Sequence, residues 1–425
     1  MSGESRGDWA RLTLGEICAR SGGFIQTGPF GSQLHASDYT TMGVPVVMPV
    51  NIGENRIAEE AIARIPPHEA ARLERHKLRP GNIVYGRRGD IGRRALITTN
   101  EDGWLCGTGC LRIDLGNGVL DPEFATYFLS NPETRDWIVR RAVGTTMPNL
   151  NTAILSAVPF VVPPVAEQRG IGRALGALDD KISLNRRMNR TLESMARAIF
   201  RSWFVDFDPV VAKAASRQPF GMSADVAALF PDRFVDAGIG PIPCGWRFGR
   251  LDDLVVLQRG YDLPATGRTP GIYPVLSAGG PTGTHCEFKV RGPGVTTGRS
   301  GQLGAVYFVH EDFWPLNTSL YVKEFRASSP LHAYFLLQTL DFDSFNAGSA
   351  VPTLNRNHVH NLPVVVPPEK LLAHFNGFAE PLFNLSRNNE AESCTLAALR
   401  NTLLPKLMSG ELRVREAEAL VGSHV

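Results

Sequence analysis

The sequence predicts a mixed α/β (α+β) protein with a pseudo-two-fold internal duplication. Two similar globular regions are expected to be separated by two long helices that pair as an antiparallel coiled coil. Three observations support this: two stretches with heptad spacing, a set of short motifs that occurs twice in the same order, and β-rich runs bounded by glycine and proline. The 425 residues are enough for several domains with cores of their own.

The first helical stretch follows Pro163-Pro164. Apolar residues recur there at alternating steps of four and three, which predicts a helix about 60 Å long. Asn185 and Asn189 are costly in an apolar seam, but they fix the register, because a slip would bury an amide without a partner. The predicted seam is Ile171, Leu175, Leu178, Ile182, Asn185, Asn189, Leu192, Ala196, Ile199 and Trp203.

The second helical stretch follows Pro367-Pro368 and repeats the same steps. Each helix has to bury its apolar stripe, and the long connection between them allows antiparallel pairing. Pro381 is expected to kink or delay the second helix. Its predicted seam is Leu371, Phe375, Phe378, Leu382, Leu385, Asn389, Glu392, Leu396, Leu399 and Leu403.

The duplication is clearest in three repeated motifs. Residues 86–92 and 298–304 share the pattern glycine, arginine, x, glycine, x, aliphatic, glycine. The stretch 144–151 matches 348–355, and 159–164 matches 363–368. The predicted organisation is a first globular region (1–164), a first helix (165–207), a connector (208–243), a second globular region (244–366), a second helix (367–413) and a tail (414–425).

The two glycine loops are candidate contacts for nucleic acid. Glycines allow a backbone to approach a ligand, arginine binds phosphate or guanine, and glutamine reads adenine. A solvated turn is the alternative for the loops, and helix capping is the alternative for the Ser, Thr and Asn residues. The candidates are Gln33, His35, Arg87, Arg88, Arg93, Arg94, Thr145, Thr146, Asn149, Arg299, Ser300, Gln302, Ser349 and Asn355.

Composition sets further limits. The net charge of +2 indicates no global basic field, and only seven of the 44 basic residues are lysines. Arginine suits forked contacts with phosphate, although a GC-rich genome would give the same excess. The six scattered cysteines form no zinc pattern and are read as reduced thiols, and the N-terminus has no signal pattern, so a cytoplasmic location and no metal are expected.

No catalytic motif is convincing. Amino-methyltransferases resemble one another in a motif in which Asp, Asn or Ser precedes Pro-Pro and an aromatic residue. Here the three Pro-Pro pairs follow the apolar residues Ile65, Val162 and Val366, so the motif is absent. Asp232 with Glu287 and Lys289 is a chance match to a nuclease site, and His358-x-His360 has no third ligand nearby.

The layout resembles the specificity subunit of type I DNA restriction-modification systems over nearly the whole chain. The resemblance rests on the duplication, on the Pro-Pro-x-x-Glu-Gln-Arg sequence at 163–169, and on the stretches 200–209 and 406–412. It implies that each globular region is a target recognition domain reading half of a bipartite, asymmetric site in double-stranded DNA. The helices are then expected to set the spacing and to dock methyltransferase subunits, two of them in all.

The resemblance also implies a subunit that is not an enzyme by itself and binds no cofactor. S-adenosylmethionine, ATP and Mg²⁺ are expected only on partner subunits, which in some systems include restriction subunits. Two other readings remain: a coiled-coil protein scaffold without DNA readout, and a stand-alone DNA-modifying enzyme. Only DNA-reading domains should lose affinity for duplex DNA steeply as salt rises.

Overall fold

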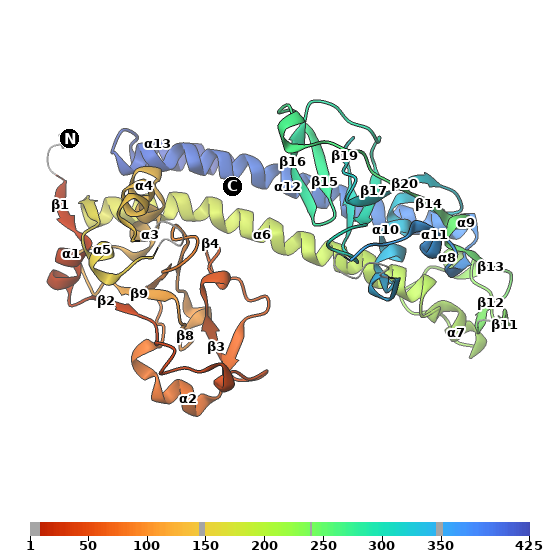
Figure 1. Cartoon of the computed structure of the whole chain (residues 1–425), viewed down its shortest axis with the longest axis horizontal. Coiled ribbons are helices and arrows are strands. Elements are labelled where there is room, and N and C mark those ends of the chain that lie inside the picture. The colour runs from red at the N-terminus through yellow and green to blue at the C-terminus, as the bar shows by residue number, and fades with distance from the viewer. Residues whose placement is uncertain (1–8, 144–148, 239, 346–351) are drawn as a thin grey trace. The chain divides into compact units, whose positions relative to one another are not determined.

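The computed structural model describes residues 9–143, 149–238, 240–345 and 352–425 (Figure 1). The chain divides into two compact units, which are called the first unit (Met1–Leu184 with Glu392–Val425) and the second unit (Asn185–Ala391). Two helices of 40 residues each, α6 (Val165–Phe204) and α12 (Glu369–Met408), contribute to both units.

The first unit contains a five-stranded sheet of order β2-β9-β6-β7-β4, a three-stranded sheet of order β5-β3-β8 and the antiparallel pair β1-β10. Its strands are β1 (Ala10–Thr13), β2 (Phe24–Thr27), β3 (Val44–Val47), β4 (Glu54–Asn55), β5 (Ala63–Ile65), β6 (Ile83–Gly86), β7 (Arg94–Leu96), β8 (Leu105–Cys106), β9 (Cys110–Asp114) and β10 (Pro159–Val162). Its shorter helices are α1 (Leu14–Ser21), α2 (Pro67–Arg72), α3 (Pro122–Ser130), α4 (Pro132–Arg141), α5 (Thr152–Ser156) and α13 (Val414–Gly422).

The second unit has a four-stranded sheet of order β14-β20-β17-β18, a three-stranded sheet of order β16-β15-β19, and the pairs β13-β21 and β11-β12. Its strands are β11 (Phe234–Asp236), β12 (Pro241–Pro243), β13 (Arg247–Arg250), β14 (Val255–Arg259), β15 (Tyr273–Ser277), β16 (Gly280–His285), β17 (Gly294–Gly298), β18 (Val306–Val309), β19 (Trp314–Pro315), β20 (Ser319–Phe325) and β21 (Pro363–Val366). Its helices are α7 (Asp208–Ala214), α8 (Ala224–Ala228), α9 (Leu251–Leu254), α10 (Pro330–Gln338) and α11 (Arg356–His360).

The two units share one architecture. The order β2-β9-β6-β7 corresponds to β14-β20-β17-β18, and the parallel pair β3-β8 corresponds to the parallel pair β15-β19. In the first unit the last strand, β10, pairs antiparallel with β1, and in the second unit the last strand, β21, pairs antiparallel with β13; each of the two leads into a 40-residue helix. The predicted fold class is therefore confirmed, including the duplication.

Each core lies between the larger sheet and the paired helices. In the first unit, Tyr85 of β6, Phe124 of α3 and Leu175 of α6 belong to one buried cluster with Leu403 of α12. The cluster of the second unit combines Leu320 of β20 and Phe335 of α10 with helix residues that include Phe200 and Phe375. Burial of such side chains is the main source of stability for each unit.

Helices α6 and α12 pack antiparallel in each unit. In the first unit, Arg400 Nη1 of α12 donates to Asp179 Oδ1 of α6 at 2.5 Å. Lys181 Nζ of α6 lies 3.5 Å from Glu392 Oε1 of α12. Most of the predicted α6 seam is confirmed as buried, with Asn189 and Ile199 half-buried. The large apolar residues at heptad spacing therefore identified the contact face of α6 correctly.

The asparagines of the seam join the two helices in the second unit. Asn185 Nδ2 donates to Asn389 O at 3.3 Å, Asn389 Nδ2 to Asn189 Oδ1 at 2.8 Å, and Asn189 Nδ2 to Ser386 O at 3.1 Å. Asn185 is only 1% exposed. A shift of either helix would break these bonds and leave buried amides unsatisfied, so the amides specify one register.

The predicted seam of α12 departs from the observed contact face at two positions, Phe378 and Leu385, although the Phe378 ring still contacts Trp203 of α6 with 5.8 Å between ring centres. Leu385 is 43% exposed and Phe378 is 48% exposed, whereas Ala379 is 1% exposed and Ser386 accepts the bond from Asn189. The contact face therefore uses small residues where the prediction chose the larger apolar neighbour one position earlier. The other predicted members fit better, because Leu396 and Leu403 are buried and Leu382 and Leu399 are half-buried against the cores.

The expected interruption at Pro381 is also wrong, because α12 continues through it. Proline in a helix removes one hydrogen bond and its ring crowds the carbonyl of the residue four positions earlier. That residue is Gly377, around which a side chain would meet no atom within 4 Å, and Pro381 itself is exposed. The ring therefore lies on an open face of the helix.

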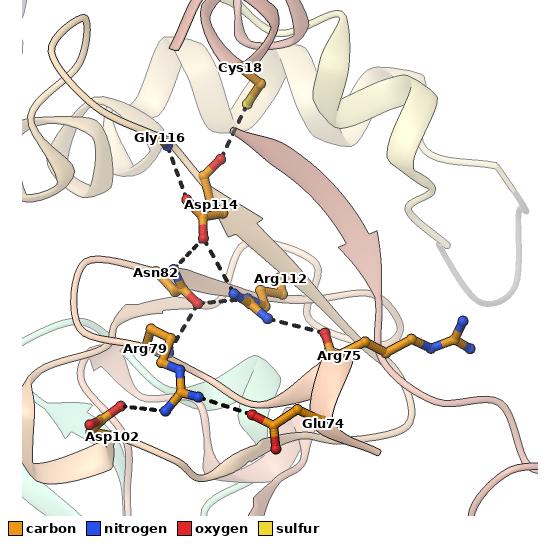
Figure 2. A network of polar contacts seen from close by, with 9 residues as sticks. All are labelled: Cys18, Glu74, Arg75, Arg79, Asn82, Asp102, Arg112, Asp114 and Gly116. Atoms are coloured by element: carbon orange, nitrogen blue, oxygen red, sulfur yellow. Dashed lines mark hydrogen bonds and ion pairs between the residues drawn. The ribbon is translucent and has the colours of Figure 1, made fainter. Parts of the chain in front are cut away.

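A buried arginine organises the larger sheet of the first unit (Figure 2). Arg112 of β9 is 8% exposed, and its Nε donates to Asn82 Oδ1 at 2.6 Å. Its terminal nitrogens donate to Asp114 Oδ2 at 3.3 Å and to Arg75 O at 3.1 Å, and its guanidinium lies 5.0 Å from the ring centre of Phe24. A buried charge is tolerated only when it is paired and hydrogen-bonded in this way.

The second unit has different side chains at the matching position of its larger sheet. Leu111 pairs with the last residue of β2, and Leu320 pairs with the last residue of β14, so the residues that follow them, Arg112 and Tyr321, occupy matching positions. The Tyr321 hydroxyl lies 3.0 Å from the Tyr261 hydroxyl. The two units thus share strand order while their interiors have diverged.

Replacement of Arg112 by methionine should destabilise the first unit by about 2 to 3 kcal/mol, because it leaves the buried Asn82 amide and the half-buried Asp114 carboxylate without their cation. Arg79→Met is the matched control, since Arg79 is 51% exposed at its side chain and pairs with Glu74 and Asp102 at the surface. The control should cost about 1 kcal/mol or less. Urea denaturation measures both, and equal losses would contradict the role of Arg112.

The second unit should lose stability as the pH falls, because His332 of α10 is buried next to Phe200 and Phe204 of α6 and burial lowers its pKa from 6.5 to about 3. The unfolded chain takes up the proton near pH 6.5, whereas the folded chain resists it down to about pH 3. The contribution of neutral His332 to the free energy of unfolding is therefore complete above pH 6.5. It decreases by about 1.4 kcal/mol for each pH unit as the pH falls from 6.5 toward 3. His332→Gln should flatten this slope in urea denaturation at several pH values; an unchanged slope would contradict the assignment.

Candidate nucleic-acid interface

The two glycine loops occupy matching places at the ends of central strands. The first loop (87–93) joins β6 to β7, and the second loop (299–305) joins β17 to β18. Leu150 N donates to Arg87 O at 2.9 Å, and Leu354 N donates to Arg299 O at 2.8 Å. The same hydrogen bond therefore ties the loop to the second repeated motif in both units, although these segments are far apart in the sequence. The contact of Leu150 with Arg87 is called the first junction, and the contact of Leu354 with Arg299 is called the second junction.

Arg87 holds the first junction together. Its Nε donates to Asn149 Oδ1 and to Leu150 O, both at 3.2 Å. Arg88 and Arg93 are exposed, and Arg93 forms an ion pair with Asp90 at 2.9 Å. The hydrogen bond from Arg93 lowers the pKa of the Asp90 carboxyl. Arg88 and Arg93 are therefore the arginines of this loop that are available to a ligand.

Arg94 was predicted as a contact residue, but it is buried. It is 9% exposed, and its Nε donates to Thr126 O of α3 at 2.9 Å. Burial lowers its pKa to about 10. Since successive side chains of a strand point to opposite faces, Arg94 at the start of β7 points to the core and Arg93 to solvent.

The second loop carries different side chains. Arg299 is half-buried and its Nη1 donates to Asn317 O at 3.4 Å. The backbone nitrogens of Arg299 and Ser300 both donate to Thr318 O, at 2.9 and 3.0 Å. Gln302 is exposed. The frame of the loop is thus fixed by its backbone, while Gln302 faces solvent.

The middle glycine of each loop leaves the surface open. Gly89 has φ of 77° and Gly301 has φ of 93°, a left-handed conformation that favours glycine. A side chain at either position would meet no atom within 4 Å. The backbone is therefore accessible to a ligand at both positions.

The remaining candidates have local roles or lie elsewhere. Gln33 Oε1 accepts from Phe30 N at 3.2 Å, and the exposed His35 donates its backbone N–H to Asp38 Oδ2 at 2.7 Å. Asn149 accepts from Arg87, while Asn355 caps α11 by accepting from Asn357 N at 3.0 Å. Thr145, Thr146 and Ser349 lie outside the described residues.

Sequence reasoning missed two arginines. Arg259 and Arg356 line a cleft of about 560 Å³ together with Arg299 and the second junction. They lie almost a hundred positions apart and belong to different motifs, so only the strand pairing brings them together. An arginine at the end of a predicted strand is too common a feature to identify them.

The described residues offer no site for a metal: no group of three or more His, Cys, Asp or Glu side chains among them could hold one. His360 of the His358-x-His360 pair accepts from Leu257 N at 2.9 Å, which is a structural contact. No helix in the described part of the chain is both long and apolar enough to cross a membrane.

Comparisons with known proteins agree with this architecture. Residues 7–194 match the family described as "Type I restriction modification DNA specificity domain". The chain is 24% identical to the type I restriction enzyme HindI specificity subunit of Haemophilus influenzae, over 95% of this chain and 100% of that one. It is 25% identical to the MjaIX specificity subunit of Methanocaldococcus jannaschii, over 86% and 84% of the two chains.

A solved structure has the same fold. The S subunit of a type I restriction-modification system from M. genitalium superimposes with a TM-score of 0.56 at 17% identity, covering 96% of this chain and 98% of that one. Residues 7–194 therefore carry the type I restriction modification DNA specificity domain, and the chain is similar over nearly its whole length to specificity subunits of type I restriction-modification systems.

Proposed function

We propose that each unit reads one half of a bipartite site in double-stranded DNA, and that the glycine loops take part in this contact. The observation that carries the proposal is the repeated junction, in which Leu150 bonds to Arg87 and Leu354 bonds to Arg299. The same backbone arrangement therefore occurs in both units, whereas the exposed side chains of the two loops differ. A conserved frame with variable side chains suits two domains that bind the same kind of ligand and read different sequences.

The chemistry of the loops fits base and phosphate contacts. Arg88 and Arg93 in the first unit are able to bind phosphate or the O6 and N7 atoms of guanine, and Gln302 in the second is able to pair with N6 and N7 of adenine. Because the two sets of side chains differ, the two half-sites are expected to differ as well. The full site is then asymmetric, unlike the palindromes read by symmetric dimers.

Helices α6 and α12 are proposed to set the distance between the half-sites and to dock methyltransferase subunits, two of them in all. Arg186, Arg187 and Arg197 are exposed on α6 away from its apolar seam, which supports a role in docking. A restriction subunit is a further partner in systems that cleave DNA.

The chain is proposed to be non-catalytic by itself and to act in the cytoplasm. S-adenosylmethionine, ATP and Mg²⁺ would bind to the partner subunits, so that this chain selects the DNA and its partners carry out the chemistry. The separate finding that specificity subunits are the relatives of this chain supports that division.

Sequencing of modified bases tests the proposal in cells that carry the methyltransferase partner with or without this chain. We expect methylation at one split motif with two unlike halves and a fixed gap, and its loss when the chain is removed. Arg88→Ala with Arg93→Ala should change or weaken the half read by the first unit, and leave the other half unchanged. A continuous motif, or methylation that does not depend on this chain, would contradict the proposal.

A further inference from the structure

The second unit contains an arginine-lined cleft beside its glycine loop. The cleft has a volume of about 560 Å³ and is lined by Arg259, Arg299, Leu320, Thr353, Leu354, Asn355 and Arg356. Arg356 is exposed, the Arg259 side chain is 51% exposed, and Arg299 is half-buried. Three guanidinium groups therefore border one opening.

Strand pairing brings these arginines together. Arg259, the last residue of β14, pairs with Leu320 of β20, and Leu320 pairs on its other side with Thr297 of β17. Arg299 follows β17 by one residue, and Arg356 begins α11 directly after the second junction. The cleft is thus built on the central sheet, from segments with fixed hydrogen bonds.

The cleft carries an excess of positive charge. Arg259 Nη2 lies 3.3 Å from Asp262 Oδ1, and Asp262 also accepts from Asn317 Nδ2. Arg299 Nη1 donates only to the carbonyl of Asn317. Within the described part of the chain, the Arg356 side chain has no ion pair. The residues that line the cleft thus include three arginines and no carboxylate, a balance that favours an anionic ligand.

We propose that this cleft binds the sugar-phosphate backbone of duplex DNA, with Arg259 and Arg356 as phosphate contacts beside Arg299. The inference rests on the proposed function. Arg299, Leu354 and Asn355 belong both to the cleft and to the loop junction, so a DNA strand that reaches the exposed Gln302 passes beside the arginines. Guanidinium groups match phosphate in geometry and charge.

The matched positions of the first unit carry threonines in place of two of these arginines. Thr27 pairs with Leu111 as Arg259 pairs with Leu320, so Thr27 takes the place of Arg259. Asn151 caps α5 as Asn355 caps α11, so Thr152 takes the place of Arg356. The second unit therefore binds the DNA backbone through two more cations than the first unit at matched positions.

The salt dependence of DNA binding tests the inference without knowledge of the target, because phosphate contacts carry no sequence information. The full chain is titrated with random-sequence duplex DNA in fluorescence anisotropy, from about 50 to 200 mM salt. Arg259→Ala and Arg356→Ala should each reduce the slope of log K against log salt by about 1, with roughly tenfold weaker binding at low salt. The loss should be the same for unrelated duplex sequences.

Three further variants serve as controls. Arg326→Ala removes another surface arginine of the second unit, paired with Glu324 at 3.4 Å and absent from the cleft, and should leave the slope unchanged. Arg259→Lys keeps the charge and should keep the slope. Thr152→Arg introduces the missing cation into the first unit and should raise the slope by about 1. Thermal melting confirms that each variant is folded.

The outcomes separate this inference from the proposed function. A steep slope for the unchanged chain, together with unchanged slopes for Arg259→Ala and Arg356→Ala, overturns the inference and leaves the proposed function intact. Losses confined to one duplex sequence overturn it as well, since they indicate base readout. A flat slope for the unchanged chain contradicts the proposed function itself and favours a protein scaffold.

Discussion

The asparagine amides between α6 and α12 are the constraint on which the rest of the structure depends. Asn185, Asn189 and Asn389 exchange hydrogen bonds across the helix pair, and Ser386 completes the series. Apolar contacts would tolerate a shift of one heptad, whereas these amides would not. Because both helices extend into both units, one register in the pair fixes where each unit meets its helices.

The duplication preserves backbone connections and varies the side chains placed on them. The strand order, the parallel pair in the smaller sheet and the bond from leucine to the loop arginine occur in both units. By contrast, Arg112 with its polar network corresponds to a tyrosine pair in the second unit. Two of the cleft arginines, Arg259 and Arg356, correspond to Thr27 and Thr152 in the first unit. This combination suits the proposed function, because a shared frame would present the ligand site while the side chains would choose the sequence.

The sequence was informative wherever periodicity or repetition carried the signal. Leu175, Leu178 and Ile182 were identified correctly because large apolar residues follow the heptad, and the repeated loops were found by comparing the halves. Two positions of the α12 seam, Phe378 and Leu385, were placed one residue too early, because the small neighbours Ala379 and Ser386 face α6 while the larger side chains are more exposed. Arg94 and the arginine cleft were missed because burial and strand pairing depend on residues distant in the sequence.

The most direct test of the central claim is the insertion of one heptad into both helices, between Leu184 and Asn185 in α6 and between Ala391 and Glu392 in α12. This keeps the register of each unit and adds about 10 Å of helix, or up to about three base pairs of DNA. A heptad in the exposed turn between Asn117 and Gly118 is the control. The account predicts a longer gap between two unchanged half-sites in the methylation map. Altered half-site bases with an unchanged gap would contradict it.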